Sequence, residues 1–363
     1  MRPAITKSPR KSAPAIPASP AERDLPVIDA LYAVGGLTRT GRVTGRGRRK
    51  RAAGASAEEL RRRSAAPCTA VNGVAWLPVP GWRFPWLRAG FSTRIGGVSR
   101  AYCADDAPGE LNLGFTAEDD RAAVERNRRL LAEAVTGSPE VPISVVRQFH
   151  SGLVVVAGRD EALRERPRKA DGILATESGL LIGIQVADCI PVLVADKRKK
   201  IVAAFHAGWR GTVKRIVETG VGRMRMEFGS EPRDLIAAIG PGIGPCCYAV
   251  GEEVVSEVES QFAYSTELFH EVYDEEPVRL KYPMLFLTQR APGHSPIGPQ
   301  IHLDLVEANR RQLLAAGVRA KAIEIVGGCT SCQPELFFSH RGSRGHAGRM
   351  MAVVGIRGER KKS

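Results

Sequence analysis

The sequence predicts an α/β fold, in the broad sense that includes α+β, preceded by a basic extension. Three observations lead to this expectation: short apolar runs typical of buried strands, apolar residues at helical spacing between them, and a change in composition near Val71. With 363 residues, 43% of them hydrophobic, the chain can form one large core or two smaller ones.

The expected strands are apolar runs bounded by turn residues. Two of them flank a short polar turn of five residues, which favours an antiparallel hairpin. The expected strands are residues 143–150, 180–186, 191–195, 201–205 and 351–356.

The expected helices are segments in which apolar residues recur every three or four positions. The first follows Asp119 and Asp120, which are suitable residues for the start of a helix. The expected helices are residues 120–135, 213–224, 252–262 and 304–315, and residues 275–300, with five prolines, are expected to form a long loop.

The positive charge is concentrated before the expected domain. Residues 1–68 contain 15 Lys or Arg and 5 Asp or Glu, so they carry +10 of the net charge of +14. Because this segment is rich in Pro, Ala, Ser, Gly and Arg, we expect a disordered extension, followed by a globular domain at 70–357 and a basic tail at 358–363. Nucleic acid is not an expected partner, except through the basic extension.

The cysteines and the apolar segments indicate in which cellular compartment the protein is expected. Seven cysteines scattered over a long chain do not resemble a small disulfide scaffold, so we expect reduced thiols and a cytoplasmic protein. No apolar run reaches about 18 residues, and no secretory signal is apparent, so no membrane association is expected.

The hairpin predicts a metal or nucleophile site at its open end. If strands 191–195 and 201–205 pair about a turn centred near Arg198, Cys189 lies near Ala207 and His206 lies near Ile190. Cys189 and His206 would then be close enough to share a zinc ion, with His150 as a third ligand and one position left open. Two other interpretations remain: buried packing, and a Cys–His nucleophilic pair. Asp188 could orient a ligand, act as a base or cap a strand.

Other segments suggest anion binding or a second metal site. The turn that carries Arg210 leads into a helix and would suit a phosphate, and Arg94 lies beside another Gly turn. The segment 240–248 lacks the pattern of a nucleotide-binding P-loop. Cys329 and Cys332 form a C-x-x-C pair, for which structural zinc or a redox pair is an open alternative, but zinc usually needs a second such pair and the sequence has none.

Several of these segments together resemble the laccase-domain family of purine nucleoside phosphorylases, also labelled polyphenol oxidase or peptidoglycan editing factor. The segments occur in the family's order between about residues 70 and 356. They are STRIGGVS (92–99), LNLG (111–114), QFH (148–150), ADC (187–189), HAGWRG (206–211), GPGIGPCCY (240–248), LDL (303–305), residues 329–332, residues 337–339 and GRM (348–350).

The resemblance implies a single compact laccase-like domain, similar to the cytotoxic necrotizing factor fold, with mixed β-sheets flanked by helices. It also implies a zinc site at His150, Cys189 and His206. The expected activity is phosphorolysis of adenosine, inosine, guanosine and methylthioadenosine to the free base and ribose 1-phosphate, with adenosine deaminase activity. Purine nucleosides and phosphate are therefore the expected partners; the oligomeric state is left open.

Within this expectation, Asp188 is the candidate proton shuttle of the deaminase reaction. Arg94, Arg210 and Arg349 are the candidates to hold phosphate. Two alternatives use other chemistry. Copper would replace zinc in a polyphenol oxidase, but the chain has seven histidines and no H-x-H pair for a trinuclear centre. A Cys–His hydrolase would use Cys189 as nucleophile to edit a peptidoglycan precursor.

Overall fold

The computed structural model describes residues 66–103, 106–162, 164, 166–273, 281 and 299–358. Residues 1–65 of the predicted extension, nearly all of the loop expected at 275–300, and the C-terminal tail from residue 359 lie outside the described part of the chain. Within the described residues, no helix is both long enough and apolar enough to cross a lipid bilayer.

Two six-stranded sheets form the centre of the domain. The first, here called the β8 sheet, has the order β1 (Cys68–Thr69), β2 (Ala75–Pro78), β3 (Leu87–Ser92), β15 (Met350–Ile356), β8 (Leu180–Val186) and β5 (Ile143–Val145). The second, the β9 sheet, has the order β14 (Ile323–Ile325), β11 (Leu235–Ile239), β9 (Ile190–Asp196), β10 (Ile201–Ala207), β7 (Gly172–Ala175) and β6 (Val154–Val156). Both sheets mix parallel and antiparallel pairs, which confirms the predicted fold class.

The remaining elements cover the sheets or connect them. The helices are α2 (Arg121–Thr136), α3 (Arg159–Ala162), α4 (Trp209–Val213), α5 (Ile216–Phe228), α6 (Glu252–Gln261) and α8 (Leu305–Ala315). Strand β4 (Ile95–Ser99) lies outside the two sheets, and β12 (Phe269–Val272) pairs with β13 (Gln300–Leu303). Short 3-10 helices occupy Pro232–Asp234, Ser265–Glu267 and Ala320–Ala322.

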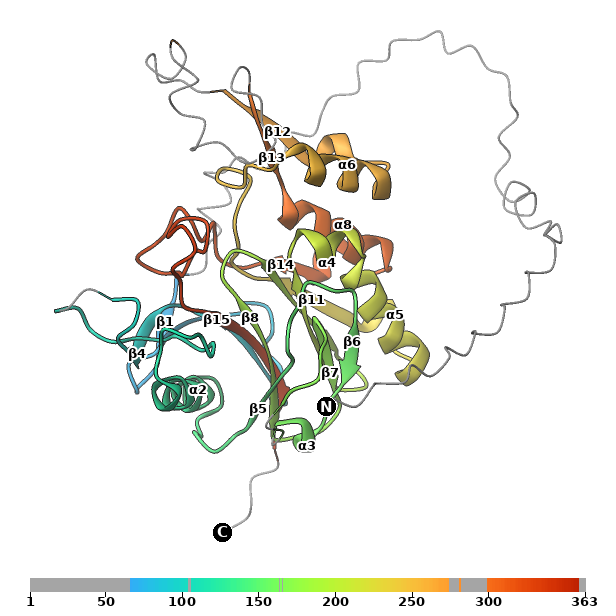
Figure 1. Ribbon diagram of the computed structural model, residues 1–363. Coiled ribbons are helices and arrows are strands. Elements are labelled where there is room, and N and C mark those ends of the chain that lie inside the picture. The colour runs from blue at the N-terminus through green and yellow to red at the C-terminus, as the bar shows by residue number, and fades with distance from the viewer. Residues whose placement is uncertain are drawn as a thin grey trace, which may run out of the picture. The chain divides into compact units, whose positions relative to one another are not determined.

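The two sheets pack face to face, and helices cover their outer faces (Figure 1). Alternate residues of β9 show why this strand is apolar throughout. Leu193 faces the β8 sheet, whereas Val194 faces α5 and α8 on the other side. On the outer face of the β8 sheet, Leu131 of α2 packs against Val353 of β15. Strands covered on both faces read as continuous apolar runs, and this explains why the sequence revealed them.

The predicted hairpin forms, but its register differs by one residue from the prediction. Ala207 pairs with Ile190, and His206 pairs with Pro191. The predicted pairing of Cys189 with Ala207 is therefore wrong. The connection has four residues, Lys197 to Lys200, because the Asp196 carboxylate accepts hydrogen bonds from the next backbone N–H groups and tightens the turn.

Two other predicted elements are altered. The helix expected at 213–224 is divided, since Arg215 adopts a left-handed backbone conformation with φ 55° between α4 and α5. The strand expected at 143–150 ends at Val145, and beyond it Arg147 forms only an isolated bridge. The other predicted helices and strands are present within one or two residues of their expected bounds.

Candidate metal centre

The candidate site lies where the chain passes from one sheet to the other. Strands β8 and β9 belong to different sheets, yet only Ala187, Asp188 and Cys189 connect them. Asp188 makes this sharp passage with a φ of 87°, an uncommon conformation for a residue other than glycine. Such strained residues often occur at functional sites.

Three potential ligands converge at this passage. Their ligand atoms, from His150, Cys189 and His206, all lie within 4.8 Å of one another. Cys189 Sγ is 3.9 Å from His150 Nε2, and the two imidazole rings are 4.9 Å apart between centroids. His206 is buried, Cys189 is half-buried and His150 is exposed, so the group opens to solvent on one side. A group of three protein ligands with an open side is typical of catalytic zinc sites.

A buried carboxylate that the sequence analysis missed organises this group. Asp171 precedes β7, is fully buried, and lies 2.8 Å from His206 Nδ1. This contact leaves Nε2 of His206 for a metal ion, which is how carboxylates commonly orient histidine ligands. Burial alone would raise the pKa of Asp171, but hydrogen bonds from His206 and Ser151 hold it well below its usual range.

Asp171 also explains why the strand predicted to reach His150 stops early. Its carboxylate accepts the backbone N–H groups of Phe149, His150 and Ser151, at 2.6 to 3.3 Å. These donors therefore bind a side chain and no strand partner, and His150 adopts a φ of 62°. The only signal in the sequence was an aspartate directly before an apolar run, which is too common to single out.

The protonation of Cys189 and His206 is coupled. Burial acts to raise the pKa of the Cys189 thiol, but the charge of His206 and the hydrogen bond with His150 outweigh it and lower the pKa to about 6. Burial acts to lower the pKa of His206, but the Cys189 thiolate and Asp171 raise it to about 9. Without metal, a thiolate–imidazolium pair is therefore expected between these two values.

We expect alkylation of Cys189 in metal-free protein to rise with a midpoint near pH 6 and to be blocked by added zinc. The lowered pKa means that the thiolate is present above pH 6 and is lost as the pH falls below it. Peptide mapping after iodoacetamide treatment at a series of pH values would measure the midpoint. In His206→Gln the midpoint should move upward. A wild-type midpoint near the ordinary thiol value of about 8.5 would contradict the pairing.

Gly208 has no room for a side chain. A Cβ atom at this position would lie 2.8 Å from Cys189 Sγ and 3.2 Å from His150 Cδ2. We expect Gly208→Ala to displace the thiol and to weaken metal binding by roughly tenfold or more, comparable to the loss of an orienting contact. Isothermal titration with zinc would measure the change. Gly222→Ala, in the middle of α5 with open space around it, is the matched control and should retain wild-type affinity.

Asp188 binds neighbouring loops through both of its carboxylate oxygens. One accepts the Thr330 hydroxyl at 2.6 Å, and the other accepts the Arg341 backbone N–H at 2.6 Å. Its backbone carbonyl accepts the N–H of Ile243. These contacts hold the residue next to Cys189 in place, while its expected role as a proton shuttle stays a prediction.

The three predicted phosphate-binding arginines have different surroundings. Arg349 lines an open pocket together with His150, Cys189 and His206. Arg94 pairs with Glu110 at 2.5 Å and donates to the Pro334 carbonyl, and Arg210 stacks on Trp209. Neither Arg94 nor Arg210 is among the described residues that line this pocket, and their phosphate role stays a prediction.

The pocket is strongly basic. Three glutamates line it, against seven arginines: Arg121, Arg128, Arg129, Arg147, Arg164, Arg166 and Arg349. Such a surface attracts anions, and guanidinium groups bind phosphate through paired hydrogen bonds.

A second group of possible metal ligands corrects an expectation from the sequence. Cys329 and Cys332 do have partner cysteines, because Cys246 and Cys247 lie beside them. The sequence hid this group because the second pair is adjacent in the chain and does not follow the C-x-x-C spacing.

The comparisons with known proteins agree with this architecture. A family profile described as "Multi-copper polyphenol oxidoreductase laccase" matches residues 88–357. The chain belongs to this laccase-like family.

The relatives that the chain resembles are named as phosphorylases, whereas the family profile is described as an oxidoreductase. "Purine nucleoside phosphorylase YlmD" of Geobacillus stearothermophilus is 35% identical over 289 residues, which cover 78% of this chain and 95% of that protein. "Purine nucleoside phosphorylase" of Bacteroides thetaiotaomicron is 31% identical over 270 residues, 73% of this chain and 90% of that protein. The crystal structure of YlmD from Geobacillus stearothermophilus matches with a TM-score of 0.63 and 34% identity, covering 78% of this chain and 96% of the other.

Proposed function

We propose that this protein is a zinc-dependent purine nucleoside phosphorylase that also deaminates adenosine. Its substrates are adenosine, inosine, guanosine, methylthioadenosine and phosphate. The observation that carries the proposal is the convergence of His150, Cys189 and His206 at the edge of an arginine-lined pocket. The names of relatives that align over nearly their full length support it.

The ligand set fits zinc. Imidazole and thiolate are both zinc ligands, three protein ligands are typical of catalytic zinc sites, and Asp171 leaves Nε2 of His206 available. A blue-copper centre also uses two histidines and one cysteine, but a multicopper oxidase needs a further trinuclear centre, and the sequence contains no H-x-H pair to build one. When bound, zinc would supply a Lewis acid that polarises oxygen at neutral pH.

We assign phosphate binding to the basic pocket, with Arg349 and Arg128 as its main groups. Both line the pocket, and Nη2 of Arg128 is buried without a hydrogen-bond partner among the described residues. Burial lowers the pKa of Arg128 to about 10, so it still carries its charge at neutral pH. An anion bound there would satisfy this nitrogen and would lie in the pocket that the metal ligands also line.

The test is product analysis combined with metal quantification. Purified, zinc-loaded protein should release hypoxanthine from inosine only when phosphate is present, together with ribose 1-phosphate. Adenosine should give adenine with phosphate and inosine without it. Absence of base release from every purine nucleoside at saturating zinc and phosphate would overturn the proposal.

The lowered pKa of Cys189 favours one other candidate, a Cys–His hydrolase acting on a peptidoglycan precursor. In that enzyme Cys189 would form a covalent intermediate, and zinc would inhibit. Hydrolysis of such a precursor by metal-free protein, with a covalent Cys189 intermediate and inhibition by added zinc, would favour the hydrolase. Zinc-dependent phosphorolysis without an adduct would favour the phosphorylase.

A further inference from the structure

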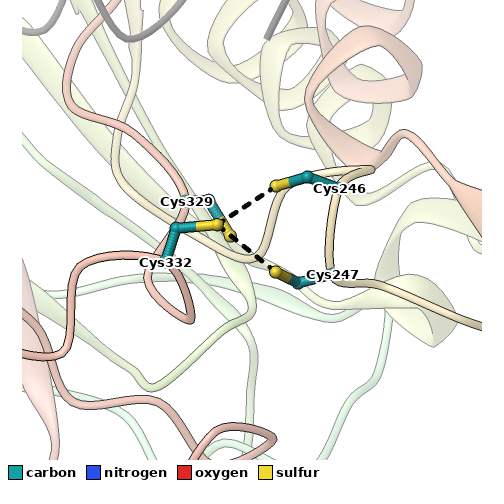
Figure 2. A group of neighbouring side chains, drawn as sticks. All are labelled: Cys246, Cys247, Cys329 and Cys332. Atoms are coloured by element: carbon teal, nitrogen blue, oxygen red, sulfur yellow. Dashed lines mark hydrogen bonds between the residues drawn. The ribbon is translucent and has the colours of Figure 1, made fainter. Parts of the chain in front are cut away.

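Four cysteines from two distant parts of the chain meet in one place (Figure 2). Cys246 and Cys247 lie in the loop that follows β11, and Cys329 and Cys332 lie in the loop that follows β14. Because β11 and β14 are parallel neighbours, their carboxyl ends lie side by side, and both loops start there. The topology therefore brings together thiols that are more than 80 residues apart.

We propose that Cys246, Cys247, Cys329 and Cys332 together bind one zinc ion, at a structural site separate from the His150–Cys189–His206 group. On binding, the zinc ion replaces the thiol protons, which pass to solvent.

The spacing of the sulfurs suits a single ion. All four Sγ atoms lie within 4.8 Å of one another. Cys332 Sγ is 3.5 Å from Cys246 Sγ and 3.4 Å from Cys247 Sγ. In a tetrahedral site with zinc–sulfur bonds of about 2.3 Å, the sulfurs are about 3.8 Å apart. A small adjustment of the side chains would therefore be enough to place all four around one ion.

The backbone around the sulfurs also suits bound thiolates. The N–H of Gly244 donates a hydrogen bond to Cys329 Sγ at 3.2 Å. Backbone donors of this kind stabilise the negative charge on metal-bound sulfur. A Cβ atom on Gly244 would lie 3.2 Å from Cys329 Cβ and 3.3 Å from Cys246 Sγ, so this close approach depends on glycine.

The chemistry favours zinc over other occupants. A tetrahedral set of four thiolates selects zinc or iron–sulfur clusters, and oxygen-preferring ions are disfavoured. An iron–sulfur cluster holds its cysteines around several atoms, whereas these sulfurs all lie within 4.8 Å of one another. Disulfides would form pairs, yet Cys332 lies equally close to both Cys246 and Cys247.

The four-cysteine site would hold in place the loop after β14, which contacts the His150–Cys189–His206 group through Asp188. Thr330 lies between Cys329 and Cys332, and its hydroxyl donates to Asp188, which precedes Cys189. The Thr330 N–H donates to the Gly242 carbonyl in the partner loop. A zinc ion that ties the two loops together would therefore hold Asp188, and through it Cys189, in position.

The experiment counts zinc per chain and assigns it to a site. Full-length protein is loaded with zinc, and the excess zinc is removed. The zinc that stays bound is then measured by mass spectrometry. Compared with wild type, the double variant C329S/C332S should lose about one zinc per chain. The variant C189A/H206A should retain that zinc, whatever the other site binds. Cys68→Ser, at an exposed cysteine outside both groups, is the matched control and should match wild type.

The absorption spectrum of cobalt-loaded protein provides a second test of the site. Cobalt-loaded wild type and C189A/H206A should both show strong sulfur-to-cobalt absorption, whereas C329S/C332S should lose most of it. If the cysteine variants do not fold, the zinc content of C189A/H206A decides, because it should still be about one per chain. Wild-type protein unfolded in chelator without reductant should also show seven reactive thiols, and each disulfide would lower this count by two.

Three results would overturn the proposal. These are no loss of zinc in folded C329S/C332S, fewer than seven thiols in wild-type protein unfolded in chelator without reductant, or stoichiometric iron in place of zinc when both metals are offered. The result does not depend on the proposed phosphorylase activity, because the C189A/H206A variant separates the two sites.

Discussion

Replacing His206 with alanine should abolish phosphorolysis of inosine and release the metal from the His150–Cys189–His206 group. His206 is the buried member of that group, which contains no fourth ligand among the described residues. If the metal contributes about 4 kcal/mol to the transition state, its loss lowers kcat by about 10³-fold. Steady-state kinetics with inosine and phosphate, with zinc measured in the same samples, would test this expectation.

His270→Ala is the matched control for this variant. His270 is exposed on β12, outside both groups of metal ligands among the described residues, so activity and zinc content should remain at wild-type levels. A thermal unfolding curve of His206→Ala shows whether the variant is folded. Wild-type turnover in a folded His206→Ala protein would exclude this group as the catalytic centre.

Asp171→Asn should affect both stability and metal binding. The carboxylate accepts three backbone N–H groups, the Ser151 hydroxyl and His206 Nδ1. In asparagine, an amide nitrogen replaces one of the two carboxylate oxygens. This nitrogen donates and does not accept, so several of these donors would lose their acceptor. We expect a loss of about 3 kcal/mol in the free energy of unfolding. Metal affinity should fall about 10- to 100-fold, because His206 is no longer oriented.

The pH dependence of stability provides a sharper test of Asp171. Its pKa in the folded protein lies below the unfolded value of about 3.9. The carboxylate therefore stabilises the fold above that value, and the stabilisation is lost as the pH falls below it. Urea unfolding of metal-free protein at several acidic pH values should show this loss in wild type and a smaller one in Asp171→Asn. Asp160→Asn, at an exposed aspartate in α3, should behave as wild type.

The sequence by itself determined the class of fold and most of its elements. Strands such as β8, β9 and β10 are apolar throughout because both of their faces are covered. Helix α2 was evident from its apolar spacing and from Asp120, whose side chain accepts the N–H of Ala123 at the start of the helix. The proximity of Cys189 and His206 was also predicted, since a short hairpin places its two open ends side by side.

Only the tertiary structure decided what surrounds those residues. The one-residue register shift came from Asp196 in the turn, and the early end of β5 came from Asp171, which captures backbone donors that would otherwise pair with a strand. The four cysteines meet because β11 and β14 are neighbours in the sheet. Local patterns determine which segments become strands and helices. Contacts between residues far apart in the chain depend on how those elements pack, and this packing leaves no periodic trace in the sequence.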